Sequence, residues 1–348
     1  DALYSHRGVE LVSVFGPEHG VRGDRQDAML IESTVDEATG VPVYSLYGEV
    51  MKPTVEMLDG VEALVFDIQD IGARFYTYAS TLTYCMEAAS EQDVPIVVLD
   101  RPNPVNGLSV EGNILEPGFE SFVGLHQVPI RHGLTIGELA TVINEGIGAE
   151  LTVVEMEGWE RRMWFDGTGL PWVQPSPNIP TPETAVVYPG TCLFEGVNIS
   201  EGRGTTQPFE YLGAPWIEGR KWAGSLNKLF LEGVSFRACN FTPIFSKYQG
   251  EGCGGIQVHV TDRESYTPVE TALHMLSMAI ELWPGDFDWL PPSQGGRLHF
   301  DLLAGTDGIR LDLSRGVPVE DIVEGWKDEL EEFKVMRWDH LLYPTGGE

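Results

Sequence analysis

The sequence predicts an α/β protein built on a doubly wound, mostly parallel sheet, with a second and smaller α/β domain behind it. Short apolar runs rich in β-branched residues alternate along the chain with segments whose apolar residues recur at helical spacing. Strands that alternate with helices form parallel sheets through crossover connections. The pattern changes near residue 220, so we predict domains at 1–219 and 220–348 in this chain of 348 residues.

The first predicted domain carries most of the alternating pattern. Apolar runs predict strands at 9–15, 42–46, 63–66, 96–99 and 151–156. Helical spacing predicts helices at 77–91 and 134–147, and Thr135 followed by Glu138 indicates a capping box in the second helix. The segment 168–182 is rich in proline and aromatic residues. It suits neither a regular helix nor an inner strand, so we expect an ordered wall against the core.

The second predicted domain mixes helices and strands in a different order. Helical patterns cover 223–231, 269–282 and 319–333, and the last of these has one apolar face. Apolar runs predict strands at 234–240 and 255–260.

Acidic residues dominate the charge of the chain. Asp and Glu number 53 against 22 Lys and Arg, which gives a formal net charge of −31. We therefore expect neither nucleic acid nor an anionic membrane as a partner, because both are bound by cationic surfaces. Acids spread along the whole chain also suggest adaptation to high salt, where screening reduces self-repulsion. On this halophilic hypothesis the melting temperature rises with KCl concentration, and greatest stability in dilute buffer would contradict it.

Motifs for common cofactors and for several enzyme classes are absent. No Gly-x-Gly-x-x-Gly follows the first strand and no Gly-Lys-Ser/Thr phosphate loop occurs, so nucleotide binding is disfavoured. The four cysteines form no Cys-x-x-Cys pair, and neither His-Glu-x-x-His nor Gly-x-Ser-x-Gly is present. We expect no metal, no cofactor and no catalytic serine, with a metal-dependent hydrolase as the weaker alternative.

Polar clusters follow three of the predicted strands. A glycine-rich loop at 16–24 follows the first strand, and further clusters follow the strands at 63–66 and 96–99. Parallel strands bring their carboxyl ends to one edge of a sheet, where ligands bind in open α/β folds. The candidate residues at this edge are Glu18, His19, Arg22, Asp67, Asp70, Arg74, Asp100, Arg101 and Asn103.

Glu18 is the first candidate for a catalytic acid or base, because it follows a strand end among glycines. Asp67 or Asp70 is the candidate partner, since paired carboxylates divide acid and base roles, although Asp70 also suits a helix N-cap. Arg74 suits either a bidentate contact with a substrate carboxylate or an ion pair with Asp70. His19 is either a donor to the substrate or a structural histidine.

A second polar, glycine-rich loop spans 195–207 and again mixes acids, an arginine, amides and hydroxyls. We predict that Glu201 and Arg203 in this loop face a ligand. Tyr76 is a candidate for stacking on a sugar ring, and it equally suits the core.

Five strings in the chain resemble those of the exo-β-N-acetylmuramidase family of glycoside hydrolases. They are Phe-Gly-Pro-Glu-His-Gly-Val-Arg-Gly (15–23), Val-Phe-Asp-Ile-Gln-Asp-Ile-Gly-Ala-Arg-Phe-Tyr-Thr-Tyr (65–78), Leu-Asp-Arg-Pro-Asn-Pro (99–104), Pro-Ser-Pro-Asn-Ile-Pro-Thr (175–181) and Phe-Glu-Gly-Val-Asn-Ile-Ser-Glu-Gly-Arg-Gly-Thr-Thr (194–206). The resemblance implies a Rossmann-like domain that holds the catalytic cleft. It also implies Glu18 as a catalytic residue and adds Asn178 and Asn198 to the expected cleft residues.

The activity implied by the resemblance is release of N-acetylmuramic acid from the non-reducing end of peptidoglycan fragments. Glu18 then protonates the glycosidic oxygen, and Arg74 or Arg203 pairs with the lactyl carboxylate. The second catalytic group is either a carboxylate or the substrate's own acetamido group. A non-catalytic binding protein for acidic sugars is the alternative. The expected ligand is a small carbohydrate, a homo-oligomer is compatible with the sequence, and a cytoplasmic location is slightly favoured, although the family includes exported members.

Overall fold

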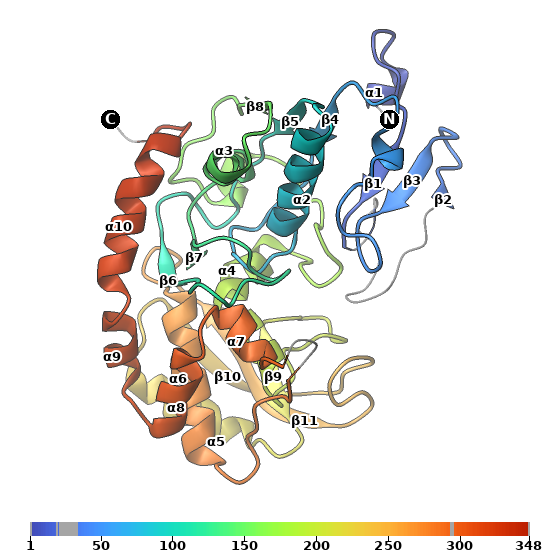
Figure 1. Cartoon of the computed structure of the whole chain (residues 1–348). Coiled ribbons are helices and arrows are strands. Elements are labelled where there is room, and N and C mark those ends of the chain that lie inside the picture. Colours follow the sequence, from blue (N-terminus) through green and yellow to red (C-terminus); the bar gives the residue numbers. More distant parts are fainter. Residues whose placement is uncertain (1, 19, 21–33, 293–295, 347–348) are drawn as a thin grey trace.

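The computed structural model describes residues 2–18, 20, 34–292 and 296–346. Figure 1 shows two lobes, an upper one built on a parallel sheet and a lower one built on an antiparallel sheet. Helices α9 (Val319–Glu324) and α10 (Lys327–Arg337) lead from the lower lobe back to the upper one, where α10 packs on β6 (Glu111–Ile114).

The parallel sheet of the upper lobe has the order β4 (Leu64–Phe66), β5 (Ile96–Leu99), β8 (Leu151–Val154). Helices α2 (Tyr78–Glu91) and α3 (Ile136–Ile147) pack against this sheet and against each other. The capping box of α3 forms as predicted, with Glu138 Oε2 accepting from the Thr135 N–H at 2.9 Å and Thr135 Oγ1 accepting from the Glu138 N–H at 3.1 Å. The predicted α/β class with a parallel sheet is confirmed.

The first two predicted strands differ from expectation in their pairing. β1 (Val14–Gly16) pairs in parallel with β3 (Pro42–Ser45), and β2 (Thr34–Val35) pairs antiparallel with β3. This mixed sheet is separate from β4-β5-β8 in the described residues. The predicted strand at 9–15 is also wrong over 9–13, because those residues take part in no strand.

The lower lobe contains the antiparallel sheet of β10 (Val234–Phe241), β11 (Cys253–Val260) and β9 (Tyr211–Ala214), in that order. Helix α5 (Gly219–Leu226) packs on this sheet, and α6 (Pro268–Leu282) packs against α5. β9 lies before residue 220 yet shares a sheet with β11. The position of the domain boundary stays a prediction.

Several short elements escaped prediction because turns and proline dominate their sequences. β6 pairs antiparallel with β7 (Pro129–Arg131), and α4 (Pro182–Thr191) starts at a proline capped by Thr181. The helix expected at 319–333 is broken between α9 and α10 at Gly325 and Trp326. The remaining elements are α1 (Ala2–Ser5), α7 (His299–Ala304), α8 (Gly308–Arg315), η1 (Glu56–Leu58), η2 (Phe165–Thr168), η3 (Cys192–Gly196), η4 (Asn227–Leu229) and η5 (Trp338–His340).

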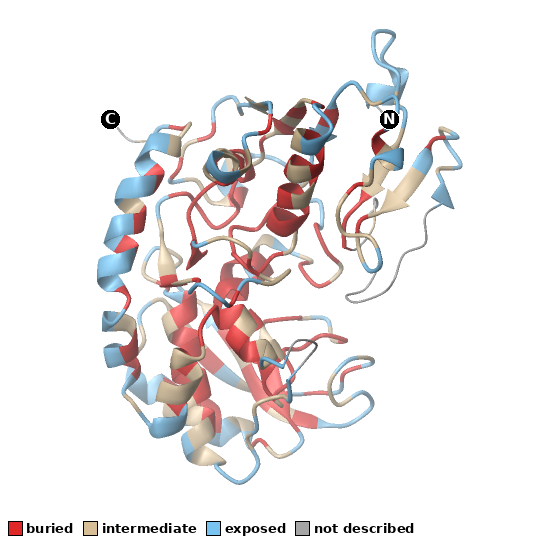
Figure 2. Ribbon diagram, viewed as in Figure 1, coloured by how far each residue is buried: buried red, intermediate tan, exposed pale blue. Residues whose placement is uncertain are grey.

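Buried residues run through the interior of both lobes and across the region where they meet (Figure 2). One hydrophobic cluster lies around the parallel sheet and includes Leu82 and Ile96. A larger cluster fills the lower lobe and includes Phe194, Trp222 and Phe300. The four cysteines carry free thiols. In the described part of the chain, no helix is long and apolar enough to cross a membrane.

Gly190 marks the closest approach of α4 to α6, and it gives a stability prediction. A Cβ at this position would lie 1.9 Å from the Pro268 carbonyl oxygen, so Gly190→Ala should lower the free energy of unfolding by at least about 1–3 kcal/mol. Gly146 in α3 is the matched control, since its Cβ would meet no atom within 4 Å. Gly146→Ala should stabilise by about 0.5–1 kcal/mol. Thermal melting should show a lower melting temperature for Gly190→Ala and a higher one for Gly146→Ala. Equal shifts in the two variants would contradict the packing argument.

Candidate active site

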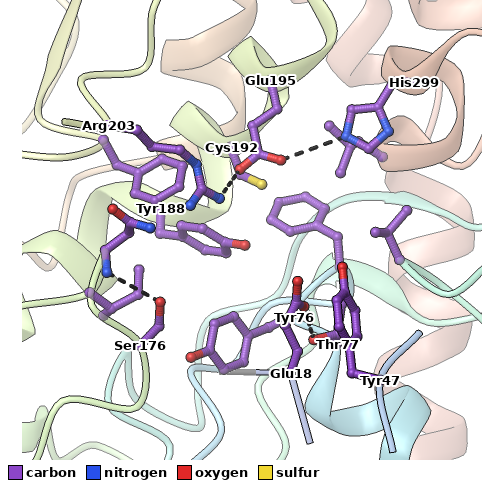
Figure 3. A pocket seen from close by; sticks show the side chains of 16 residues that line it. Glu18, Tyr47, Tyr76, Thr77, Ser176, Tyr188, Cys192, Glu195, Arg203 and His299 are labelled. Carbon is purple, nitrogen blue, oxygen red and sulfur yellow. Dashed lines mark hydrogen bonds and ion pairs between the residues drawn. The ribbon is translucent and has the colours of Figure 1, made fainter. Parts of the chain in front are cut away.

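A cavity of about 240 Å³ is lined by residues of both lobes (Figure 3). Its volume lies just below the range of about 300–1,000 Å³ typical of pockets for drug-sized ligands, so it suits a single sugar unit. The lining residues are Glu18, Tyr47, Phe75, Tyr76, Thr77, Val123, Ser176, Asn178, Ile179, Tyr188, Cys192, Glu195, Arg203, Phe209, His299 and Leu303.

Glu18 forms part of the wall that the upper lobe contributes. β1 ends at Gly16, and Pro17 turns the chain so that Glu18 lies beside the start of α2. The Thr77 hydroxyl donates a hydrogen bond to Glu18 Oε2 at 2.7 Å. Glu18 is only 6% exposed although it lines the cavity. The structure therefore presents a largely desolvated carboxyl group to any ligand in the pocket.

The opposite wall carries a second carboxyl group, Glu195, which the lower lobe supplies from η3. Arg203 Nη2 lies 2.6 Å from Glu195 Oε1, and His299 Nε2 lies 3.6 Å from Glu195 Oε2. Burial by itself would raise the pKa of Glu195, but Arg203 and His299 lower it to about 2. Glu195 is therefore ionised near neutral pH.

A half-buried lysine anchors the loop that carries Arg203. Lys247 Nζ donates to the carbonyl oxygens of Phe194 and Ile199, at 2.7 and 3.1 Å, and lies 2.9 Å from Glu201 Oε2. Glu201 Oε1 in turn lies 3.4 Å from Arg203 Nε. Two carboxylates and two cations thus alternate behind the pocket, and the cluster is balanced in charge when His299 is neutral.

Aromatic rings complete the pocket walls. Tyr76 and Tyr188 meet edge to face at 5.9 Å between ring centroids, and Tyr188 meets Phe209 in the same way at 4.7 Å. Burial raises the pKa of both tyrosines well above the usual value, so their hydroxyls stay neutral. Such faces suit the apolar side of a sugar ring.

The proline-rich segment packs against the core mainly in its second half. Asn178 is buried and lines the pocket, and its backbone N–H donates to Ser176 Oγ at 3.2 Å. The Pro175 carbonyl oxygen accepts from the Tyr78 hydroxyl at 2.5 Å. In the first half Val173 is 74% exposed, whereas Trp172 packs edge to face on Phe165 at 4.7 Å.

Four of the predicted site residues line the pocket, namely Glu18, Tyr76, Asn178 and Arg203. His19 and Arg22 lie outside the described residues. The other eight predicted residues are placed elsewhere by the structure, each with its own partners: Asp67, Asp70, Arg74, Asp100, Arg101, Asn103, Asn198 and Glu201.

Arg74 does not reach the pocket, because its guanidinium is enclosed by backbone oxygens. It donates to the carbonyl groups of Asn113, Val128, Leu303 and Ala304 at 2.8–3.1 Å. It is 3% exposed, and burial lowers its pKa to about 9. These contacts tie the upper lobe to α7. They replace the two roles that the sequence suggested for Arg74, a contact with a substrate carboxylate and an ion pair with Asp70.

The remaining polar clusters hold strands and loops together. Asp67 and Arg101 form an ion pair at 2.5 Å with both side chains more than 40% exposed. Asp100 accepts hydrogen bonds from the hydroxyls of Thr135 and Tyr343, at 2.7 and 2.5 Å. Asn103 likewise bonds the backbone at Leu134 and Val105, and Asn198 bonds the backbone at Asp286 and Asp288. Partners within the fold, both side chains and backbone groups, thus occupy these polar groups, which sequence spacing could not reveal.

Asp70 is buried behind the pocket and gives a pH prediction. Its Oδ2 accepts from the Gly72 N–H at 2.7 Å, whereas Oδ1 has no hydrogen-bond partner among the described residues. Burial raises its pKa from 3.8 to about 7. Because the folded-state pKa is raised, this carboxyl group favours folding below pH 4, and that contribution is lost as the pH rises to 7.

Asp70→Asn should therefore stabilise the protein relative to the unmodified chain, by an amount that grows from pH 4 to pH 7 and is constant above. The rise in pKa from 3.8 to about 7 sets an upper limit of about 4 kcal/mol. Urea unfolding at pH 4, 6 and 8 measures the difference. A difference that is the same at the three pH values would show that Asp70 ionises normally.

Two pocket residues, Glu195 and His299, were missed by sequence reasoning. Glu195 opens the glycine-rich loop at 195–207, so its neighbourhood was identified although its role was not. His299 begins α7 and is more than a hundred residues away from Glu195 in the sequence. No local pattern pairs the two. Within the described ranges, no group of three or more His, Cys, Asp or Glu residues is arranged to hold a metal ion.

The two-lobed α/β fold, with carboxyl groups on opposite walls of a sugar-sized, aromatic-lined pocket, is the arrangement of a glycoside hydrolase. Comparison with known families agrees: residues 1–183 match the N-terminal model and residues 186–343 the C-terminal model of exo-beta-N-acetylmuramidase NamZ. The chain belongs to the exo-β-N-acetylmuramidase NamZ family.

Relatives support this assignment in sequence and in structure. The chain is 52% identical over 345 residues to the peptidoglycan beta-N-acetylmuramidase NamZ of Bacillus subtilis (strain 168), covering 99% of this chain and 82% of that protein. A DUF1343 family protein from Bacteroides fragilis NCTC 9343 superposes with a TM-score of 0.90 at 39% identity, over 99% of this chain and 89% of the other. A second protein of that family from the same organism gives a TM-score of 0.75 at 32% identity, over 97% and 88%.

Proposed function

We propose that this protein is an exo-β-N-acetylmuramidase that releases N-acetylmuramic acid from the non-reducing end of peptidoglycan-derived fragments. The observation that carries the proposal is the pocket of about 240 Å³ with Glu18 on one wall, in a chain 52% identical to a peptidoglycan beta-N-acetylmuramidase. A pocket for one sugar unit suits removal of terminal residues rather than cleavage within a chain.

Glu18 is the general acid in this proposal. Glu18 lines the cavity and is only 6% exposed, and in its protonated form its carboxyl group donates a proton to the glycosidic oxygen. The Thr77 hydroxyl holds one carboxyl oxygen at 2.7 Å and so helps to fix the side chain at the pocket wall. General acid catalysis of this kind contributes about 10²–10⁴-fold to the rate.

Arg203 is the proposed contact for the lactyl carboxylate that distinguishes N-acetylmuramic acid from N-acetylglucosamine. It lines the pocket, whereas Arg74 is enclosed by backbone carbonyl groups. The positive charge of its guanidinium group attracts a carboxylate, while Nη2 also pairs with Glu195 at 2.6 Å. The ring faces of Tyr76 and Tyr188 provide apolar surface for the sugar.

The test is incubation with two defined disaccharides, followed by mass analysis. N-acetylmuramic acid linked β-1,4 to N-acetylglucosamine should be split into its two sugars. The disaccharide with the reversed order, which has N-acetylglucosamine at its non-reducing end, is the matched control and should stay intact. Calorimetric binding without cleavage would favour a sugar-binding protein, and loss of cleavage in EDTA would favour a metal-dependent hydrolase.

A further inference from the structure

The pocket holds a second carboxylate, Glu195, on the wall that faces Glu18. Figure 3 shows Glu18 beside α2 on one wall and Glu195 on the facing wall, with the cavity between them. The two side chains come from different lobes, since Glu18 follows β1 and Glu195 lies in η3. The fold therefore places one carboxyl group on either side of a ligand in the cavity.

Two basic side chains contact the Glu195 carboxylate. The Arg203 guanidinium lies at 2.6 Å and the His299 imidazole at 3.6 Å. A carboxylate beside a guanidinium stays ionised, which suits the second carboxyl group of a glycoside hydrolase, the partner of the acid.

Building on the proposed function, we propose that Glu195 is the catalytic nucleophile, which attacks the anomeric carbon from the side opposite Glu18. The hydrolysis then proceeds through a covalent glycosyl-enzyme and retains the β configuration. Glu195 replaces Asp67 and Asp70 as the second carboxylate, because Asp67 is paired with Arg101 at the surface and neither residue lines the cavity.

The first step forms one bond and breaks one bond. An oxygen lone pair of Glu195 bonds to C1 while the C1–O bond to the leaving sugar breaks, and the Glu18 proton moves to the leaving oxygen. In the second step, water gives a proton back to Glu18 and its oxygen bonds to C1. The C1–O bond to Glu195 breaks as this new bond forms, which restores both carboxyl groups and releases N-acetylmuramic acid.

The contacts of Glu195 favour attack on carbon over removal of a proton from water. A general base must accept a proton from water. The ion pair with Arg203 makes protonation of Glu195 unfavourable, so Glu195 is poorly suited to that role. A nucleophile never becomes protonated. The same ion pair stabilises the carboxylate that leaves in the second step, so the Arg203 contact assists both steps.

The experiment uses Glu195→Ala with a nitrophenyl β-N-acetylmuramide, whose leaving group needs no acid. Turnover should fall by at least about a thousandfold, and sodium azide should restore it with formation of the α-azide of N-acetylmuramic acid. Glu18→Ala in azide should give the β-azide, because azide then attacks the covalent intermediate. NMR of the unmodified enzyme should show the β-anomer of N-acetylmuramic acid as the first product.

Asp301→Asn is the matched control for folding. Asp301 is buried and forms a bidentate pair with Arg310 at 2.7 and 3.0 Å, on the same helix as His299, but it does not line the pocket. This variant should keep its turnover even if it melts earlier, and Glu195→Gln, which preserves the side-chain volume, should not. Melting curves of all variants confirm that each one folds.

Three results would overturn the assignment: turnover of Glu195→Ala above a tenth of the unmodified rate, the α-anomer as first product, or no α-azide on rescue. If the substrate's acetamido group is the nucleophile, Glu195→Ala would form no α-azide in sodium azide, while the unmodified enzyme would still release the β-anomer first. These outcomes are separate from failure of the proposed function, in which the unmodified protein leaves both disaccharides intact.

Discussion

Glu18→Gln should lower kcat by about 10²–10⁴-fold on the disaccharide of N-acetylmuramic acid and N-acetylglucosamine. Glutamine keeps the volume of the side chain and still accepts the 2.7 Å hydrogen bond from Thr77, but it has no proton to donate. A sugar leaving group needs that proton because its alkoxide is a strong base. The measurement is initial rate against substrate concentration, which separates kcat from KM.

The leaving group provides the control for this prediction. A nitrophenyl glycoside departs without protonation, so Glu18→Gln should lose far less kcat/KM, which reports cleavage of the glycosidic bond, on that substrate than on the disaccharide. A fold defect would reduce both rates equally. Equal losses, or disaccharide activity within tenfold of the unmodified protein, would remove Glu18 from the role of acid.

Much of the fold followed from local patterns in the sequence. The strand at 96–99, the helix at 77–91 and the capping box at Thr135 formed nearly where the pattern placed them. Such features depend on neighbours in sequence, namely apolar periodicity and side chains that bond the adjacent backbone. The separation of β1 and β3 from the parallel sheet depends instead on which strand edges meet, and short apolar runs do not encode that.

The candidate site was predictable in part for the same reason. Glycine-rich loops in the sequence pointed to Glu18 and Arg203, which both line the pocket. Arg74 and Asp100 have the same appearance in sequence, yet their partners are backbone carbonyls and distant hydroxyls. Only the fold reveals that distant carbonyl groups accept hydrogen bonds from Arg74, and that His299 approaches Glu195 from α7, far along the chain. Charged residues near a strand end therefore predict a polar cluster better than they predict a ligand contact.

Arg161→Met should destabilise the protein by about 3–5 kcal/mol, because it would leave the buried Glu138 carboxylate without its cation. Arg161 is 1% and Glu138 0% exposed, and their side chains meet at 2.5 Å. Arg161 also donates to the carbonyl oxygens of Gly107 and Gly133. Glu138 receives the Leu342 N–H at 2.9 Å, so this pair also fixes the C-terminal segment to the upper lobe.

Arg162 is the matched control, since it neighbours Arg161, is 57% exposed and pairs with Glu160 at 2.7 Å. Arg162→Met should change the free energy of unfolding by no more than about 0.5 kcal/mol. Thermal melting should show a fall of about 5–10 °C for Arg161→Met and almost none for Arg162→Met. Adding Glu138→Gln to Arg161→Met should recover part of the loss, because the uncompensated charge is then gone. A double variant less stable than Arg161→Met would mean that the capping bonds of Glu138, rather than its charge, dominate this part of the core.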